Sequence, residues 1–186
     1  MERFEDHLAI SLTRLNFIFR NKKITTECTR SFQGISLLGE SFGPFEKGKK
    51  YKMKLFTVFP FIENNLLKVD QTEKCDNVDV QRYAISERDD PKLIKRRNRL
   101  FLNRIKELKR FMDLEIDKGH KLPIDLDRFI SYTSNIVDGR LLKILKLAKA
   151  EISLDDENRL TESEKLLYKD LYNLIKTWRD FFLLFK

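Results

Sequence analysis

The amino-acid sequence predicts an α+β fold, in which a small β-rich domain precedes an α-helical bundle. Four of the six glycines, which favour turns, stand at positions 34, 39, 43 and 48, whereas residues 92–118 contain neither glycine nor proline. With 186 residues, of which 41% are hydrophobic, the chain can bury a substantial core. We expect a domain boundary near residue 85, with residues 1–85 forming the small domain and residues 86–186 the helical domain.

The first domain is expected to contain one short helix and several strands. Residues 3–20 carry apolar side chains at spacings of three and four, which favours a helix. Residues 23–28 and 35–38 are rich in β-branched and aliphatic side chains, and residues 51–55 alternate between polar and apolar types. Each of these segments is typical of a strand. The alternation in the last one would continue that strand as far as Phe59.

The second domain is expected to contain several helices. One should begin near residue 91, because Asp90 can cap it and Pro91 suits its first turn. Its apolar stripe comprises Ile94, Phe101, Ile105, Leu108 and Met112. Another helix can open at residues 125–127, with a bend or new cap at residues 138–139. A last helix should begin near residue 162, because Thr161 and Glu164 form a capping-box signature.

The charge distribution indicates one strongly cationic segment. The chain carries a net charge of +8, and residues 92–110 hold nine Lys or Arg against one acid, Glu107. Such a segment can neutralise phosphates or contact an acidic partner; the alternative is a solvated helix face balanced by acids elsewhere in the fold. The candidate contacts are Lys95, Arg96, Arg97 and Arg99. Any DNA contact would be mainly electrostatic, because no base-reading motif is present.

The sequence lacks the patterns that carry most enzyme chemistry. Cys28 and Cys75 are too far apart for a CxxC site, and the two histidines fit no metal or triad spacing. Residues 43–49 match the first seven positions of a P-loop, but Lys50 stands where Ser or Thr would hold magnesium. We therefore expect no enzyme, cofactor or metal; a magnesium-dependent enzyme built on clustered carboxylates is the third alternative. No run of about 18 apolar residues suggests a membrane span.

Residues 35–48, with the sequence ISLLGESFGPFEKG, carry a family resemblance. The segment resembles the N-terminal β domain of GINS subunits, which belong to a DNA-replication complex, and specifically the subunit type whose β domain precedes its helical domain. The similarity covers residues 34–62. The segment from Leu160 to Leu171 also resembles the capped helix of archaeal GINS subunits. Lys54 departs from the family, which often has proline there; the family pattern makes residues 55–65 a short helix instead of a strand.

The resemblance implies a non-catalytic scaffold without cofactors. It would join a paralogous subunit in a heterotetramer with two copies of each, link and stimulate the MCM helicase, and contact a RecJ-like factor and in some relatives primase. The expected subunit-interface residues are Leu167, Leu171, Leu174 and Trp178. The alternative for these residues is burial in the chain's own bundle.

In the β domain the expected structural-turn residues are Gly39, Gly43, Pro44, Phe45 and Gly48, with Phe45 in the core. The alternative function is a free-standing basic DNA-binding module. The expected location is the cytoplasm, near the nucleoid, or the nucleus in a eukaryote, with no contact to a membrane.

Overall fold

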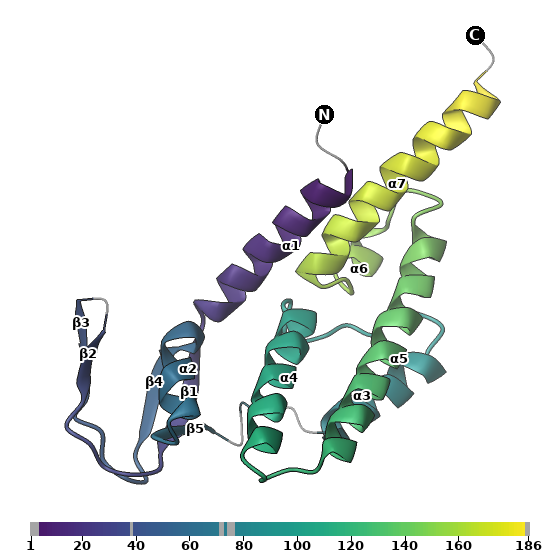
Figure 1. Cartoon of the computed structure of the whole chain (residues 1–186). Helices are drawn as coiled ribbons and strands as arrows, with labels where there is room; N and C mark the ends of the chain where they lie inside the picture. The colour runs from purple at the N-terminus through teal and green to yellow at the C-terminus, as the bar shows by residue number, and fades with distance from the viewer. Residues whose placement is uncertain (1–3, 38, 71–72, 74–76, 185–186) are drawn as a thin grey trace. The chain divides into compact units, whose positions relative to one another are not determined.

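The computed structural model describes residues 4–37, 39–70, 73 and 77–184, and it shows the predicted α+β fold (Figure 1). In chain order the elements are α1 (Phe4–Arg20), β1 (Lys23–Cys28), β2 (Ile35–Leu37), β3 (Glu40–Phe42), β4 (Lys50–Lys54), α2 (Leu55–Glu63), β5 (Leu67–Val69), α3 (Asn77–Asp89), α4 (Phe101–Asp117), α5 (Pro123–Leu147), α6 (Leu154–Glu157) and α7 (Glu162–Leu183). Leu38, at the end of one predicted strand, lies outside the described residues.

The chain divides into two compact units. The β unit comprises Phe17–Lys74, and the helical unit comprises Met1–Asn16 together with Cys75–Lys186. The division therefore falls before α3, whereas residue 85, where we expected it, lies within that helix. The N-terminal helix α1 begins in the helical unit and its last turn belongs to the β unit.

A three-stranded antiparallel sheet forms the centre of the β unit, in the order β4-β1-β5. Thr26 on β1 pairs with Tyr51 on β4 and with Val69 on β5. Thr26, Met53 and Val69 are buried on one face of the sheet. Helix α2 lies on this side, since the ring of Phe45 contacts both Tyr51, the partner of Thr26, and Phe61 of α2, with centroids 4.8 and 5.6 Å apart. Strands β2 and β3 form a separate antiparallel hairpin.

The expectation that alternation would continue the strand beyond Leu55 is wrong, because α2 occupies Leu55–Glu63 as the family pattern implied. A strand with one buried face buries every second residue. Here Val58 and Phe59 are both buried, as are Phe61 and Ile62. This pattern fits the helix, since Phe61 and Ile62 follow Val58 by three and four residues and therefore share its helix face.

The glycines of the β unit stand where the backbone turns. Gly39, Gly43 and Gly48 all have positive φ angles, of 78°, 111° and 81°. Phe45 is buried, as predicted, and its ring stacks on that of Phe32 with 4.5 Å between centroids. Pro44, between Gly43 and Phe45, is exposed.

Gly43→Ala should destabilise the β unit by more than about 1 kcal/mol, whereas Gly139→Ala should stabilise α5 by about 0.5–1 kcal/mol. A Cβ on Gly43 would stand 2.6 Å from the Cα of Gly34, at a φ that L residues rarely adopt. A Cβ on Gly139 meets no atom within 4 Å, and its helical position favours alanine. Urea unfolding followed by circular dichroism measures both changes. Equal effects of the two substitutions would contradict this account.

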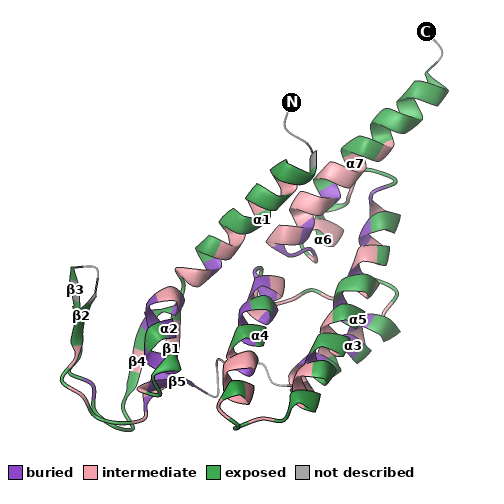
Figure 2. Cartoon of the chain, in the orientation of Figure 1, coloured by how far each residue is buried: buried purple, intermediate pink, exposed green. Residues whose placement is uncertain are grey.

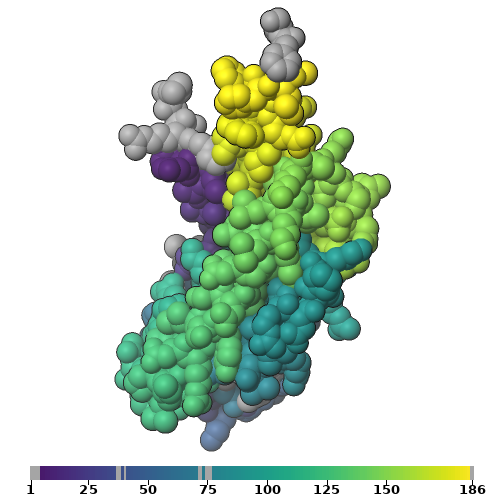
Figure 3. Space-filling model, turned by 90° about the vertical axis from the view of Figure 1, so that its right-hand side faces the viewer, coloured from purple at the N-terminus to yellow at the C-terminus, as the bar shows by residue number. Residues whose placement is uncertain are grey.

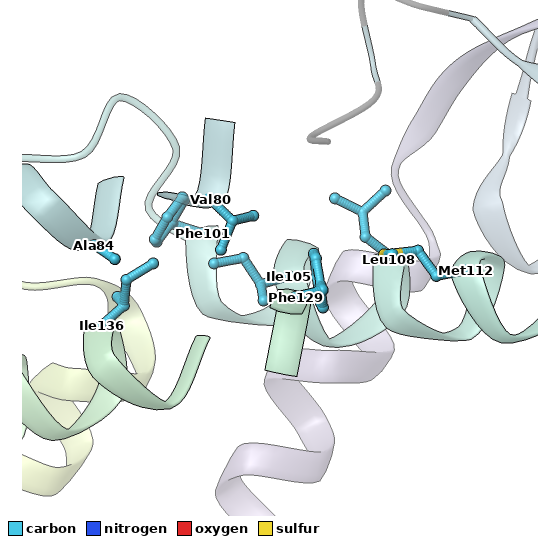
Figure 4. Close-up of a cluster of buried hydrophobic side chains, with 8 residues drawn as sticks. All are labelled: Val80, Ala84, Phe101, Ile105, Leu108, Met112, Phe129 and Ile136. Carbon is cyan, nitrogen blue, oxygen red and sulfur yellow. The ribbon is translucent and has the colours of Figure 1, made fainter. Parts of the chain in front are cut away.

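The core of the helical unit forms where α3, α4 and α5 meet (Figure 4). Phe101, Ile105, Leu108 and Met112 of the predicted apolar stripe are buried in it, facing Phe129 and Ile136 of α5 and Val80 and Ala84 of α3. Helices α3 and α5 lie side by side in both views (Figures 1 and 3). The stripe therefore packs within the chain.

Two expectations about the helices are wrong. The helix predicted near residue 91 begins at Phe101, because residues 90–100 are not helical. Asp90 accepts a hydrogen bond from the backbone N–H of Lys92 at 2.8 Å, which fixes a local turn instead of capping a helix. The bend expected at residues 138–139 is also absent, since α5 runs unbroken from Pro123 to Leu147.

Candidate subunit interface on the C-terminal helix

The last helix, α7, begins as the sequence predicts. Thr161 is its N-cap, and the carboxylate of Glu164 accepts a hydrogen bond from the Thr161 backbone N–H at 2.7 Å, which completes a capping box. The first half of the helix is anchored in the unit. Tyr168 is buried with Ile144 and Leu160, and its hydroxyl donates to the carbonyl of Ala150 at 2.9 Å.

The second half of α7 presents large apolar side chains to solvent. The exposed ones are Leu174, Trp178, Phe181, Phe182 and Leu183, and Leu184 follows at the C-cap. Trp178 is 65% exposed and Phe181 is 80% exposed. The ring of Phe182 contacts the rings of Trp178 and Phe181, with centroids 5.1 and 5.0 Å apart. This half of the helix extends beyond the other described elements of the helical unit (Figures 1 and 3), and most of it is exposed (Figure 2).

Contiguous apolar surface of this kind marks an interaction site in a folded protein. Leu167, Leu171, Leu174, Trp178 and Phe181 recur at spacings of four, three, four and three. That spacing keeps one apolar stripe along a helix and suits packing against another helix. The second half of α7 can therefore bury its stripe against a partner without rearranging the helix.

The four predicted interface residues fall into two groups. Leu174 and Trp178 lie on the exposed half of the helix. Leu171 packs, partly buried, against the cluster around Tyr168, so its contacts lie at least partly within the chain. Leu167 is partly buried and lines a groove.

The groove that Leu167 lines lies between α1, α4 and the first turns of α7 and has a volume of about 280 Å³. Its apolar lining comes mainly from Leu8 and Leu12 of α1, Leu102 of α4 and Leu167 itself. Lys106 stands at this groove as well. Apolar surface thus continues from the groove towards the exposed half of α7 on the same helix.

A buried ionic network fixes the position of α7. Arg140 of α5 is only 1% exposed, and its guanidinium holds the Glu164 carboxylate through two hydrogen bonds, from Nε and from Nη2. Its Nη1 donates to Glu87 at 2.8 Å and to the carbonyl of Ile94 at 3.0 Å, and Nη2 also donates to the carbonyl of Arg159. All five guanidinium donors are therefore used, which is the condition under which a charge can be buried.

Glu87 of α3 is the second centre of the network. Its carboxylate accepts hydrogen bonds from Arg96, Arg140 and Lys143, each at 2.8 Å. Lys143 donates further to the backbone carbonyls of Glu87 and Lys92. Arg140 and Lys143 of α5, together with Arg159 after α6, thereby hold the carbonyls of residues 92–94, which explains why that segment is not helical.

Burial and the neighbouring charges shift the pKa values of Glu87 and Arg140 in opposite directions. Burial raises the pKa of Glu87, but the hydrogen bond from Lys143 and the charge of Arg140 outweigh it and hold the pKa below the ordinary value. Burial likewise lowers the pKa of Arg140, and the hydrogen bond and charge of Glu164, followed by those of Glu87, raise it overall. Both groups are consequently ionised at neutral pH.

The stability contributed by Glu87 should depend on pH. A carboxyl whose pKa is lowered on folding stabilises the protein above its unfolded pKa, close to 4.5, and that stability is lost as pH falls through the lowered value. The difference in unfolding free energy between the wild type and Glu87→Gln should therefore be constant from pH 7 to 5.5 and shrink below pH 4.5. Urea unfolding at each pH measures it, with Asp155→Asn, at an exposed site, as the control. A difference independent of pH would contradict the assignment.

The predicted DNA-contact residues do not form one group. Lys95, Arg97 and Arg99 are exposed on the segment before α4. The structure corrects the prediction that Arg96 is a contact residue, because Arg96 pairs with Glu87 and its side chain is only 7% exposed. Its guanidinium stands 4.9 Å from the ring centroid of Tyr83 and 5.1 Å from that of Phe101. It therefore belongs to the buried network and is not available to a phosphate.

Sequence reasoning missed the network, although one signal indicated it. Arg140 occupies a position on the stripe of α5 that otherwise holds Phe129, Ile136 and Ile144. Glu87 likewise follows Val80 and Ala84 on the buried face of α3. Opposite charges on two apolar stripes predict a buried pair, because an unpaired buried charge is too costly.

Within the described part of the chain, no three His, Cys, Asp or Glu side chains gather as metal ligands would. None of the described helices combines the length and apolarity needed to cross a membrane. Comparison with known proteins found no family model and no curated protein that matches the chain.

Proposed function

We propose that this protein is a non-catalytic subunit of a GINS-type DNA-replication complex, a scaffold that links and stimulates the MCM helicase. The observation that carries the proposal is the exposed apolar half of α7, around Leu174 and Trp178. A chain that worked alone would leave this surface in water. The resemblance of residues 35–48 to the β domain of GINS subunits, with that domain ahead of the helical one, supports the choice of complex.

The mechanism is binding energy alone. Trp178 and Leu174 are the anchors, since large apolar and aromatic side chains at the centre of an interface carry most of its affinity. A paralogous subunit would cover them, in an assembly with two copies of each chain. The assembled scaffold would then contact the helicase, a RecJ-like factor and primase through surfaces that only the complex presents together.

Purification of a tagged copy from its own cells tests the proposal. Mass spectrometry identifies the proteins recovered, and light scattering gives the mass of the intact complex. We expect a second small subunit in equimolar amount, with helicase at lower yield. Recovery of the tagged chain alone, with or without nucleic acid, would overturn the proposal. An unrelated tagged protein of similar charge from the same cells is the control for charge-driven recovery.

A further inference from the structure

The face of the sheet opposite α2 is lined by lysines. The register places Lys54 opposite Lys23, and Lys52 opposite Thr25. Glu27 stands between Lys50 and Lys68. Residues that pair across a sheet point to the same face, so these side chains share one surface, away from the buried Thr26, Met53 and Val69.

Some of these lysines already have acidic partners. Lys68 pairs with Glu27 at 3.1 Å, and Lys50 pairs with Asp70 at 2.6 Å, a hydrogen bond that raises the pKa of Lys50. The carboxylate of Glu73 also reaches this face, where it accepts a hydrogen bond from the Thr25 hydroxyl at 3.3 Å. Among the described residues, Lys23, Lys52 and Lys54 form no ion pair with it or with another carboxylate. The β unit as a whole carries eleven Lys or Arg against six Asp or Glu, a surplus of five within a chain whose net charge is +8.

This arrangement is unfavourable for the sheet by itself. Like charges directly opposite each other on neighbouring strands are destabilising, and Lys23 and Lys54 are such a pair. Lysine on an edge strand such as β4 does discourage unwanted sheet pairing. That role does not require Lys23, which lies on the central strand. The excess charge is better explained by an external anion.

We propose that this lysine face binds the phosphate backbone of duplex DNA without regard to sequence. Protein interfaces are depleted of lysine and centred on aromatic and apolar side chains, whereas the strand residues of this face are all polar or charged and the ring of Phe56 on α2 stands beside Lys54 only. Lysine ammonium groups act as point charges that can contact phosphate oxygens without the fixed bidentate geometry of arginine, which suits binding that does not depend on sequence. The strands themselves carry no aromatic side chain on this face on which bases of a single strand could stack. This binding is independent of the assembly proposed above.

The test measures the affinity of the full chain for two 20-base-pair duplexes of unrelated sequence at several salt concentrations. The triple variant Lys23→Gln, Lys52→Gln, Lys54→Gln should bind on the order of 100-fold more weakly at 0.1 M salt, with the slope of log affinity against log salt reduced by about three. Both duplexes should be affected equally.

Two further triple variants are matched in charge change. Lys149→Gln, Lys169→Gln, Lys176→Gln alters exposed lysines of the helical unit and should leave the slope within about one of the wild type. The other, Lys95→Gln, Arg97→Gln, Arg99→Gln, alters the exposed basic segment. The proposal would be overturned if the slope were unchanged in the lysine-face variant and reduced in either of the other two variants. Loss of binding to an acidic peptide with full DNA affinity retained would also overturn it. Circular dichroism checks that each variant is folded.

Discussion

Arg140→Met should lower the free energy of unfolding of the helical unit by about 3–5 kcal/mol, the range for breaking a buried ion pair from one side. Methionine fills much of the same volume but offers none of the five donors of the guanidinium. Glu87 would retain Arg96 and Lys143, whereas Glu164 would keep only the backbone N–H of Thr161 among its described partners. The loss therefore comes mainly from a carboxylate left in a buried site.

Urea unfolding followed by circular dichroism at 222 nm measures this loss. Arg99→Met is the matched control, because Arg99 stands 3.7 Å from Glu162 in a pair that is largely exposed. Surface pairs contribute about 0–1 kcal/mol, so the control should change little. Similar losses in the two variants would show that the buried network does not hold the helices together.

The double variant Leu174→Ala, Trp178→Ala should weaken assembly with the partner subunit at least about 100-fold, since truncating each interface anchor typically costs 2 kcal/mol or more. The free energy of unfolding of the isolated chain should change by no more than about 0.5 kcal/mol, because both side chains are largely exposed. Titration of the purified partner, followed by light scattering or calorimetry, measures the first quantity, and urea unfolding measures the second.

The chain offers a closely matched control on another helix. Leu142 of α5 is 61% exposed, as is Leu174 of α7, so Leu142→Ala removes the same exposed apolar group away from the proposed interface. It should leave assembly intact. Leu171→Ala, in contrast, should destabilise the isolated chain, because Leu171 packs against the buried cluster around Tyr168. Normal assembly of the double variant would place the interface elsewhere.

Periodicity predicted those elements whose packing follows from their own sequence. The stripe of α4 from Phe101 to Met112 is buried as its spacing indicates, and the capping box at Thr161 and Glu164 starts α7. These signals are local: a helix buries the face that carries its apolar side chains, and a cap satisfies the N–H groups of its first turn.

The remaining features depend on contacts between distant parts of the chain. Residues 92–94 carry the signals of a helix, yet Arg140, Lys143 and Arg159 bind their carbonyls from positions about fifty residues or more away. The sequence gives no sign that Arg96 differs from the other cations of residues 92–110, because its partner Glu87 is brought beside it only by the fold. The lysine face was equally hidden, because alternation identified β4 but only the strand register brings Lys23 to Lys54.

Amide hydrogen exchange of α7, in the free chain and in the complex recovered from its own cells, tests the central claim most directly. On assembly, the amides of residues 174–184 should exchange more slowly, whereas those around Leu142 on α5 should not change. This result would place the partner on the exposed apolar half of α7. Unchanged exchange over residues 174–184, with new protection elsewhere in the chain, would contradict the claim that this helix joins the scaffold to its partner.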